Sequence, residues 1–106
     1  MNRILSITAK QLWDPFPDIS YLQQPGFEDR YQQFHNGDFS FIGIQAEAEI
    51  VAHGVCQTIT SGGLWGIESD SDRSYLSEVE HEELGELKSI LLSLGFSEEV
   101  IQQSIS

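Results

Sequence analysis

The sequence predicts an α+β fold, in which a three- to four-stranded antiparallel sheet carries helices packed on one face. Three observations predict it. Residues 39–60 alternate apolar and polar side chains with period two, as half-buried strands do. Glycine-containing segments separate the alternating runs, as turns between paired strands do. Residues 75–94 instead repeat apolar side chains at intervals of three and four, which predicts a long amphipathic helix. No repeat or change of composition divides the chain, so a single domain over residues 1–106 is expected.

The first third of the chain is expected to contain one short strand and one short helix. Residues 3–8 are an apolar run typical of a strand. Pro15 and Pro17 exclude regular structure over 14–18, because proline lacks an amide donor and restricts the residue before it. Gln24-Pro25-Gly26 is a turn signal. Aromatic residues at 27, 31 and 34 have helical spacing, so a helix is expected over 27–34, closed by Asn36-Gly37.

Three strands are then expected to form an antiparallel meander. The first covers residues 39–50, and Gly54 ends it. The second covers residues 55–60, where alternation resumes. Ser61-Gly62-Gly63 is expected to reverse the chain into a third strand over 64–67.

Two helices are expected to complete the chain. Ser69-Asp70-Ser71-Asp72 is a run of good N-cap residues before a long acidic helix over 75–94, and Gly95 suits its C-terminal end. A short final helix over 97–105 is expected to begin at Ser97 as its N-cap.

The composition is strongly acidic. Seventeen Asp and Glu oppose five Lys and Arg, so the formal net charge is −12 and the isoelectric point is near 4.3. Such a field repels nucleic acid and anionic membranes and attracts basic surfaces. The single Cys56 excludes an internal disulfide and is expected to be buried in the core. The first residues do not form a signal peptide, and no apolar run reaches the roughly 18 residues of a membrane span. A cytoplasmic protein is therefore expected.

The acidic residues are concentrated between positions 68 and 86, where Arg73 is the only opposing charge. The eight carboxylates are Glu68, Asp70, Asp72, Glu78, Glu80, Glu82, Glu83 and Glu86. Those at 78, 82 and 86 are four residues apart, so a helix places them on one side with about 6 Å of rise between neighbours. Like charges at this spacing destabilise a helix by a few tenths of a kcal/mol per pair. The row therefore predicts a surface that faces a cationic partner, although an ordinary solvated face is the alternative.

No pattern in the sequence predicts catalysis, a cofactor or a metal site. Acids at 68, 70 and 72 resemble the start of a calcium loop, but Arg73 and Val79 stand where that loop needs glycine and glutamate. The three histidines lack zinc spacing. No nucleophile signature surrounds Cys56, and residues 61–63 lack the lysine of a phosphate loop. We therefore expect a protein that is not an enzyme, with a small metal-dependent enzyme using the 68–72 acids as a rival.

Two aromatic residues flank the acidic segment. Trp65 and Tyr75 have core packing as their ordinary role, but both residue types are enriched at the centres of protein interfaces. The predicted partner-binding residues are thus Trp65, Asp70, Asp72, Tyr75, Glu78, Glu82, Glu83 and Glu86.

The stretch Thr60–Asp72, which reads TSGGLWGIESDSD, continues to Tyr75-Leu76 and resembles a segment of short uncharacterised acidic proteins of bacterial phages and mobile elements. In size and charge the chain is also similar in character to anti-CRISPR and anti-restriction inhibitors, several of which imitate DNA. The resemblance implies an inhibitor in the cytoplasm of a bacterial host cell. It would block a nucleic-acid-binding defence complex, a CRISPR effector or a restriction enzyme, with a DNA-like carboxylate surface. It would contact neither nucleic acid nor membrane directly.

Two further interpretations stay open. The chain could be a regulatory interaction module, such as an antitoxin-like neutraliser of a basic partner, and the helix over 75–94 could supply the face of a homodimer. The polar side of the first long strand, with Gln45, Glu47 and Glu49, is the second candidate interface.

Overall fold

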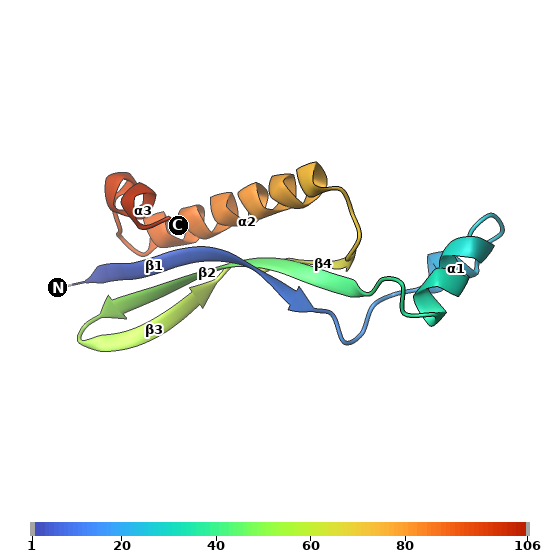
Figure 1. The fold of residues 1–106 in the computed structure, drawn as a ribbon. Coiled ribbons are helices and arrows are strands. Elements are labelled where there is room, and N and C mark those ends of the chain that lie inside the picture. The colour runs from blue at the N-terminus through green and yellow to red at the C-terminus, as the bar shows by residue number, and fades with distance from the viewer. Residues whose placement is uncertain (1, 106) are drawn as a thin grey trace.

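The computed structural model describes residues 2–105 as an α+β fold, which confirms the predicted class. A four-stranded antiparallel sheet is covered on one face by α2 and α3, while η1 and α1 lie beyond one end of the sheet (Figure 1). The elements, in order, are β1 (Arg3–Trp13), η1 (Ser20–Gln23), α1 (Glu28–His35), β2 (Phe41–Ala52), β3 (Val55–Thr60), β4 (Leu64–Glu68), α2 (Arg73–Ser93) and α3 (Glu98–Ser104).

β2 is the central strand, and all three other strands pair with it. β1 pairs along one edge, from Arg3 opposite Val51 to Trp13 opposite Ile42. β3 pairs with residues 47–52 and β4 with residues 41–44, so these two strands share the other edge, one after the other. The expected meander is therefore wrong, because residues 61–63 interrupt an edge and do not reverse the chain. β1 is also longer than expected, since its pairing with β2 continues to Trp13.

The core lies between β2 and α2. Buried residues of α2 recur at intervals of three and four, and alternate residues of β2 face them. These residues are Leu76, Val79, Leu87 and Leu91 on α2, and Ile44, Ala46, Ala48 and Ile50 on β2. The opposite side of β2 carries Gln45, Glu47 and Glu49. Cys56 lies opposite Val51 on the edge strand β3 and is exposed, so its expected burial is wrong.

The end of α2 follows the sequence-based expectation. Gly95 has a φ of 100°, and the amides of Gly95 and Phe96 donate to the carbonyls of Leu92 and Leu91. This pairing is the Schellman motif, which requires a residue with positive φ after the helix. Ser97 then caps α3 by accepting a hydrogen bond from the Val100 amide at 3.2 Å.

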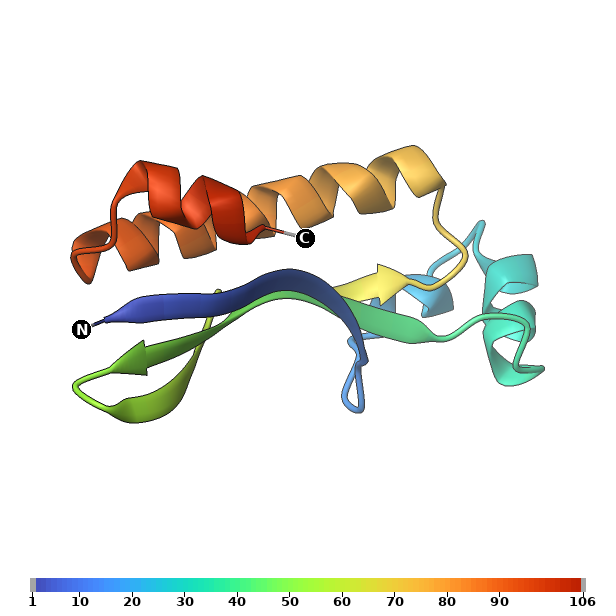
Figure 2. The same ribbon diagram turned by 60° about the vertical axis from the view of Figure 1, so that its left-hand side comes forward.

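The η1–α1 lobe has its own small apolar cluster beyond the end of the sheet. Leu22, Phe39 and Phe41 are buried there, with Tyr31 and Phe34 packed against them. The lobe and the sheet lie end to end, so the molecule measures 56 × 25 × 19 Å and its radius of gyration is 17.2 Å (Figure 2). A compact chain of about 100 residues has a radius of gyration of about 13 Å. The fold therefore exposes more surface than a compact domain of this length.

Candidate functional site

The interruption between β3 and β4 begins at Ser61, which is buried. Its amide donates to the Ala46 carbonyl, and its hydroxyl oxygen accepts the Ala46 amide, both at 2.9 Å. The side chain thus replaces a backbone acceptor in the ladder. A buried amide without a partner is costly. Because the Ser61 hydroxyl accepts the Ala46 amide, the chain can leave the strand without an unpaired donor on β2.

Two carboxylates of α2 hold the residues that follow. Glu83 accepts hydrogen bonds from the Ser61 hydroxyl at 2.7 Å and from the Gly63 amide at 2.8 Å. Glu86 accepts the Gly62 amide at 2.9 Å. Hydrogen bonds to a charged acceptor are about twice as strong as neutral ones. The helix therefore fixes the position of the strand interruption.

A third carboxylate acts from the end of β1. Asp14 is buried, and its two oxygens accept the amides of Phe16 at 3.0 Å and Gly66 at 2.9 Å. Gly66 has a φ of 75°, a conformation that favours glycine. The amides of three glycines on either side of Trp65 are thus each bonded to a carboxylate from another element.

Trp65 is fixed against the sheet but remains partly exposed. A Cβ atom at Gly43 would overlap the indole ring, so glycine at this position is what lets the ring lie on the strand. The indole N–H points to the Gly62 carbonyl at a long 3.4 Å. The residue is nonetheless 43% exposed. A large aromatic side chain held in one place at the surface is the kind of residue that anchors interfaces.

Trp65 and Tyr75, the two predicted anchors, line the same hollow. It has a volume of about 350 Å³, and Tyr21, Leu64, Ile67 and Glu68 also contribute to its wall. Tyr75 belongs to the first turn of α2 and is 44% exposed. The structure therefore brings together aromatic residues from η1, β4 and α2, two of which the sequence singled out.

Arg30 of α1 binds two carboxylates of the acidic segment, Glu68 and Asp70. Its guanidinium donates to Glu68 at 3.0 Å and to Asp70 at 2.9 Å, and it lies 3.7 Å from the centre of the Phe39 ring. The hydrogen bonds from Arg30 hold the pKa of the Asp70 carboxyl below its ordinary value. The Tyr21 hydroxyl donates to Glu68 at 3.1 Å, and burial together with the Glu68 charge raises the pKa of Tyr21 to about 12.

The predicted acidic surface is smaller than the sequence suggested. Glu83 is only 7% exposed and bonds inside the molecule, so its expected place on the partner-facing surface is corrected. Asp70 is exposed but engaged by Arg30. Asp72, the N-cap residue of α2, is exposed, as are Glu78 and Glu82 on the helix. Glu86 is exposed while also accepting the Gly62 amide.

The burial of Glu83 could have been predicted from the sequence. Glu83 lies four residues after Val79 and four before Leu87, both buried, so helical periodicity places it on the core-facing stripe. Arg30 gave no comparable signal, because it is 38 residues from Glu68 and contacts it only through the fold. The role of Asp14 was missed for the same reason, since Gly66 is 52 residues away.

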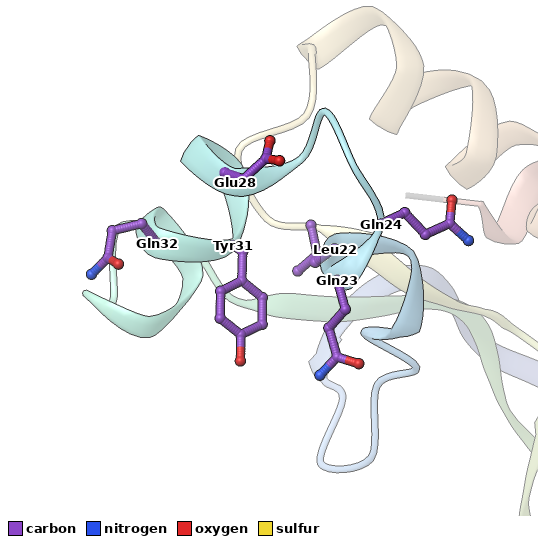
Figure 3. A pocket seen from close by; sticks show the side chains of 6 residues that line it. All are labelled: Leu22, Gln23, Gln24, Glu28, Tyr31 and Gln32. Carbon is purple, nitrogen blue, oxygen red and sulfur yellow. The ribbon is translucent and has the colours of Figure 1, made fainter.

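Another hollow, of about 400 Å³, lies between η1 and α1. It is lined by Leu22 and by five polar side chains, those of Gln23, Gln24, Glu28, Tyr31 and Gln32. The polar ends of these five side chains point in different directions (Figure 3). Such a lining contains no converging set for catalysis. Across residues 2–105, no three His, Cys, Asp or Glu side chains are grouped so as to hold a metal ion. Over the same residues, no helix has the length and apolar character to cross a membrane.

Comparisons of the chain with protein-family models, with curated proteins and with solved structures found no match.

Proposed function

We propose that this protein binds the cationic surface of a nucleic-acid-binding protein and competes with nucleic acid for it. In the form that the sequence resemblance favours, it is an inhibitor from a phage or mobile element that blocks a CRISPR effector or a restriction enzyme. The observation that carries the proposal is the placement of exposed carboxylates of α2 beside the half-exposed Trp65 and Tyr75. We call Trp65, Asp72, Tyr75, Glu78, Glu82 and Glu86 the acidic–aromatic surface.

The charge balance supports a basic partner. Four of the five Lys and Arg residues already form ion pairs with carboxylates of the same chain, namely Lys10, Arg30, Arg73 and Lys88. The net charge of −12 therefore comes from carboxylates in excess, and its field repels nucleic acid, anionic lipid and a second copy of the chain. A basic protein is the partner whose approach this field accelerates.

The geometry supports local occupancy and does not require imitation of a long duplex. Glu78, Glu82 and Glu86 are spaced by about 6 Å, whereas each DNA strand presents one phosphate per roughly 3.4 Å of axis. With Glu83 buried and Asp70 paired, the row is short. In this proposal the row steers the partner, and Trp65 and Tyr75 supply the desolvated contact that fixes register.

The short row also favours a second candidate function. A small basic protein needs fewer opposing charges than a groove built for a duplex, so an antitoxin-like neutraliser would use the same surface. The two candidates differ in the partner recovered by pull-down from host lysate. A nuclease or surveillance complex supports occupancy, and a small basic protein supports neutralisation.

The proposal is tested with Glu78→Gln/Glu82→Gln, which removes two charges while keeping side-chain size. Glu86 is left unchanged because it holds the Gly62 amide. The matched control, Asp38→Asn/Glu99→Gln, removes the same charge from exposed positions outside α2, one between α1 and β2 and one on α3. A panel of CRISPR and restriction systems, scored by restored phage plating, identifies the target, and association rates are then measured at two salt concentrations.

We expect the α2 double variant to associate about tenfold more slowly at low salt and to show a flatter salt dependence. The control should stay within about twofold of the parent protein. Equal slowing by both variants would mean that only total charge matters. Unchanged association of the α2 variant would remove the acidic–aromatic surface as the interface and leave the sheet face with Gln45, Glu47 and Glu49 as the next candidate.

A further inference from the structure

We infer that the hollow beside Trp65 and Tyr75 accepts an arginine side chain of the partner. The inference rests on the proposed function for the basic character of the partner, but it assigns a distinct chemistry to one part of the surface. The hollow would bind a guanidinium group specifically, whereas the carboxylate row on α2 would attract any positive charge.

The lining of the hollow matches a planar cation. Tyr21, Trp65 and Tyr75 contribute aromatic rings from three different elements. The face of an aromatic ring attracts cations, with Trp the strongest of the three types, and a guanidinium also stacks on such rings through its plane. Leu64 and Ile67 add apolar wall against which the methylene stem of an arginine can pack.

The electrostatics next to the hollow favour a positive charge. Glu68, the last residue of β4, is part of the wall, and Asp70 follows it in the loop between β4 and α2. Both carboxylates share the single guanidinium of Arg30, so the three groups together retain one negative charge. Asp72 and Glu78, three residues before and three residues after Tyr75 in the sequence, add exposed carboxylates around the start of α2.

The protein already binds a guanidinium in this way at the adjacent position. Arg30 lies 3.7 Å from the centre of the Phe39 ring and donates to Glu68 and Asp70. This side chain is therefore held between an aromatic face and carboxylates. The hollow offers a second place of the same kind beside Glu68. Among residues 2–105, no side chain of the protein occupies it.

The wall of the hollow is also preorganised. The Trp65 ring is held on Gly43, and the amides of the glycines around it are bonded to Asp14, Glu83 and Glu86. A side chain that is already ordered loses little conformational entropy when a ligand binds, so the binding contact is not weakened by an ordering cost.

The test uses the peptide acetyl-Gly-Ser-Arg-Ser-Gly-amide and the same peptide with citrulline in place of arginine. Citrulline keeps the shape of arginine but carries no charge. The full chain with Trp13→Phe has Trp65 as its only tryptophan, so its indole N–H signal in a proton–nitrogen NMR spectrum reports on the hollow. We expect saturable shifts with the arginine peptide, with a dissociation constant in the low-millimolar range at low salt, and none with citrulline.

Two variants in the same background test the rings. Tyr75→Leu should raise the dissociation constant of the arginine peptide at least fivefold. Tyr75→Phe keeps the ring, so its dissociation constant should stay within twofold of that of the Trp13→Phe protein. Thermal unfolding midpoints of the two variants show whether both are folded. If Tyr75→Leu does not fold, Tyr75→Ser and Tyr75→Phe are compared instead.

The outcomes separate this inference from the proposed function. Equal shifts with both peptides, or no shift with either, overturn the arginine site, while the charge-dependent association of the α2 row can still be found. Binding of arginine by the hollow together with failure to capture any basic protein supports the site and overturns the proposed function.

Discussion

At the scale of single residues, several carboxylates of this acidic chain accept hydrogen bonds from backbone amides. Asp14, Glu83 and Glu86 each accept an amide from a glycine between positions 62 and 66. An irregular segment leaves amides that no strand can pair, and each needs an acceptor. The acidity of this chain is therefore partly a structural requirement of one strand interruption.

Substitutions of Glu83 test that role. Glu83→Gln keeps an oxygen that can accept from both Ser61 and Gly63, so it should lose only the charge-assisted part, about 1 kcal/mol of the free energy of unfolding. Glu83→Leu fills the space but leaves both donors unpaired, which should cost about 3 kcal/mol. Urea unfolding with an unchanged m value measures both effects. If both variants had the same free energy of unfolding as the parent protein, neither hydrogen bond would contribute to stability.

At the scale of elements, α2 combines a buried apolar stripe with a helix-destabilising glycine, Gly85, in its interior. Gly85 lies on the exposed side of the helix, and a Cβ atom there would contact nothing within 4 Å. Glycine in a helix interior is less favourable than alanine by about 1 kcal/mol. The stability of α2 therefore depends on its packing against β2 more than on its own propensity.

The substitution Gly85→Ala should raise the free energy of unfolding by about 1 kcal/mol. The same change at Gly43 is the contrast, because the added Cβ overlaps the Trp65 ring and should lower stability by about 1–3 kcal/mol. Thermal and urea unfolding of both variants measure the difference. A loss of stability in Gly85→Ala would contradict this account of the exposed side of α2.

The elements themselves were largely predictable, because their signals are local. Period-two alternation located β2 and β3, and apolar spacing with Gly95 located α2 and its end. The partner of β4 was not predictable, since Ser61-Gly62-Gly63 is as suitable for a turn as for an interrupted edge. What decides between them is the bonding of Ser61 to Ala46 and Glu83, which are 15 and 22 residues away.

The candidate site was less predictable than the fold, for a related reason. Trp65 and Tyr75 are close in the sequence, and they line one hollow in the structure. The charges around them depend on distant residues. Arg30 reaches Glu68 and Asp70 only because the η1–α1 lobe folds back against the loop before α2.

At the scale of the whole molecule, the lobe and the sheet form an elongated body held together at one end. The aromatic cluster of Phe34, Phe39 and Phe41 packs the lobe onto the end of β2. Arg30 adds the polar link, bonding the lobe to the loop between β4 and α2. The link matters for the proposed site because Tyr21 of the lobe forms part of the hollow.

Loss of the Arg30 link should loosen the lobe without unfolding the sheet. We expect the protection factors of α1 amides in hydrogen exchange to fall about fivefold in Arg30→Gln, while those of β2 stay unchanged. Arg30→Lys should restore little, because a lysine ammonium cannot bond Glu68 and Asp70 with the planar fork of a guanidinium. Equal fall in α1 and β2 would mean that the lobe and the sheet unfold together.

The same contact has a defined pH dependence. Arg30 lowers the pKa of Asp70 below its ordinary 3.8, so the contact contributes stability that is fully present above pH 3.8 and is lost as the pH falls through the lower folded value. The difference in α1 protection between the parent protein and Arg30→Gln should therefore be constant at neutral pH and shrink only under acid conditions. In an Asp70→Asn background this part of the pH dependence should disappear. A difference that shrinks already between pH 5 and 7 would show that another group, not Asp70, controls the attachment of the lobe.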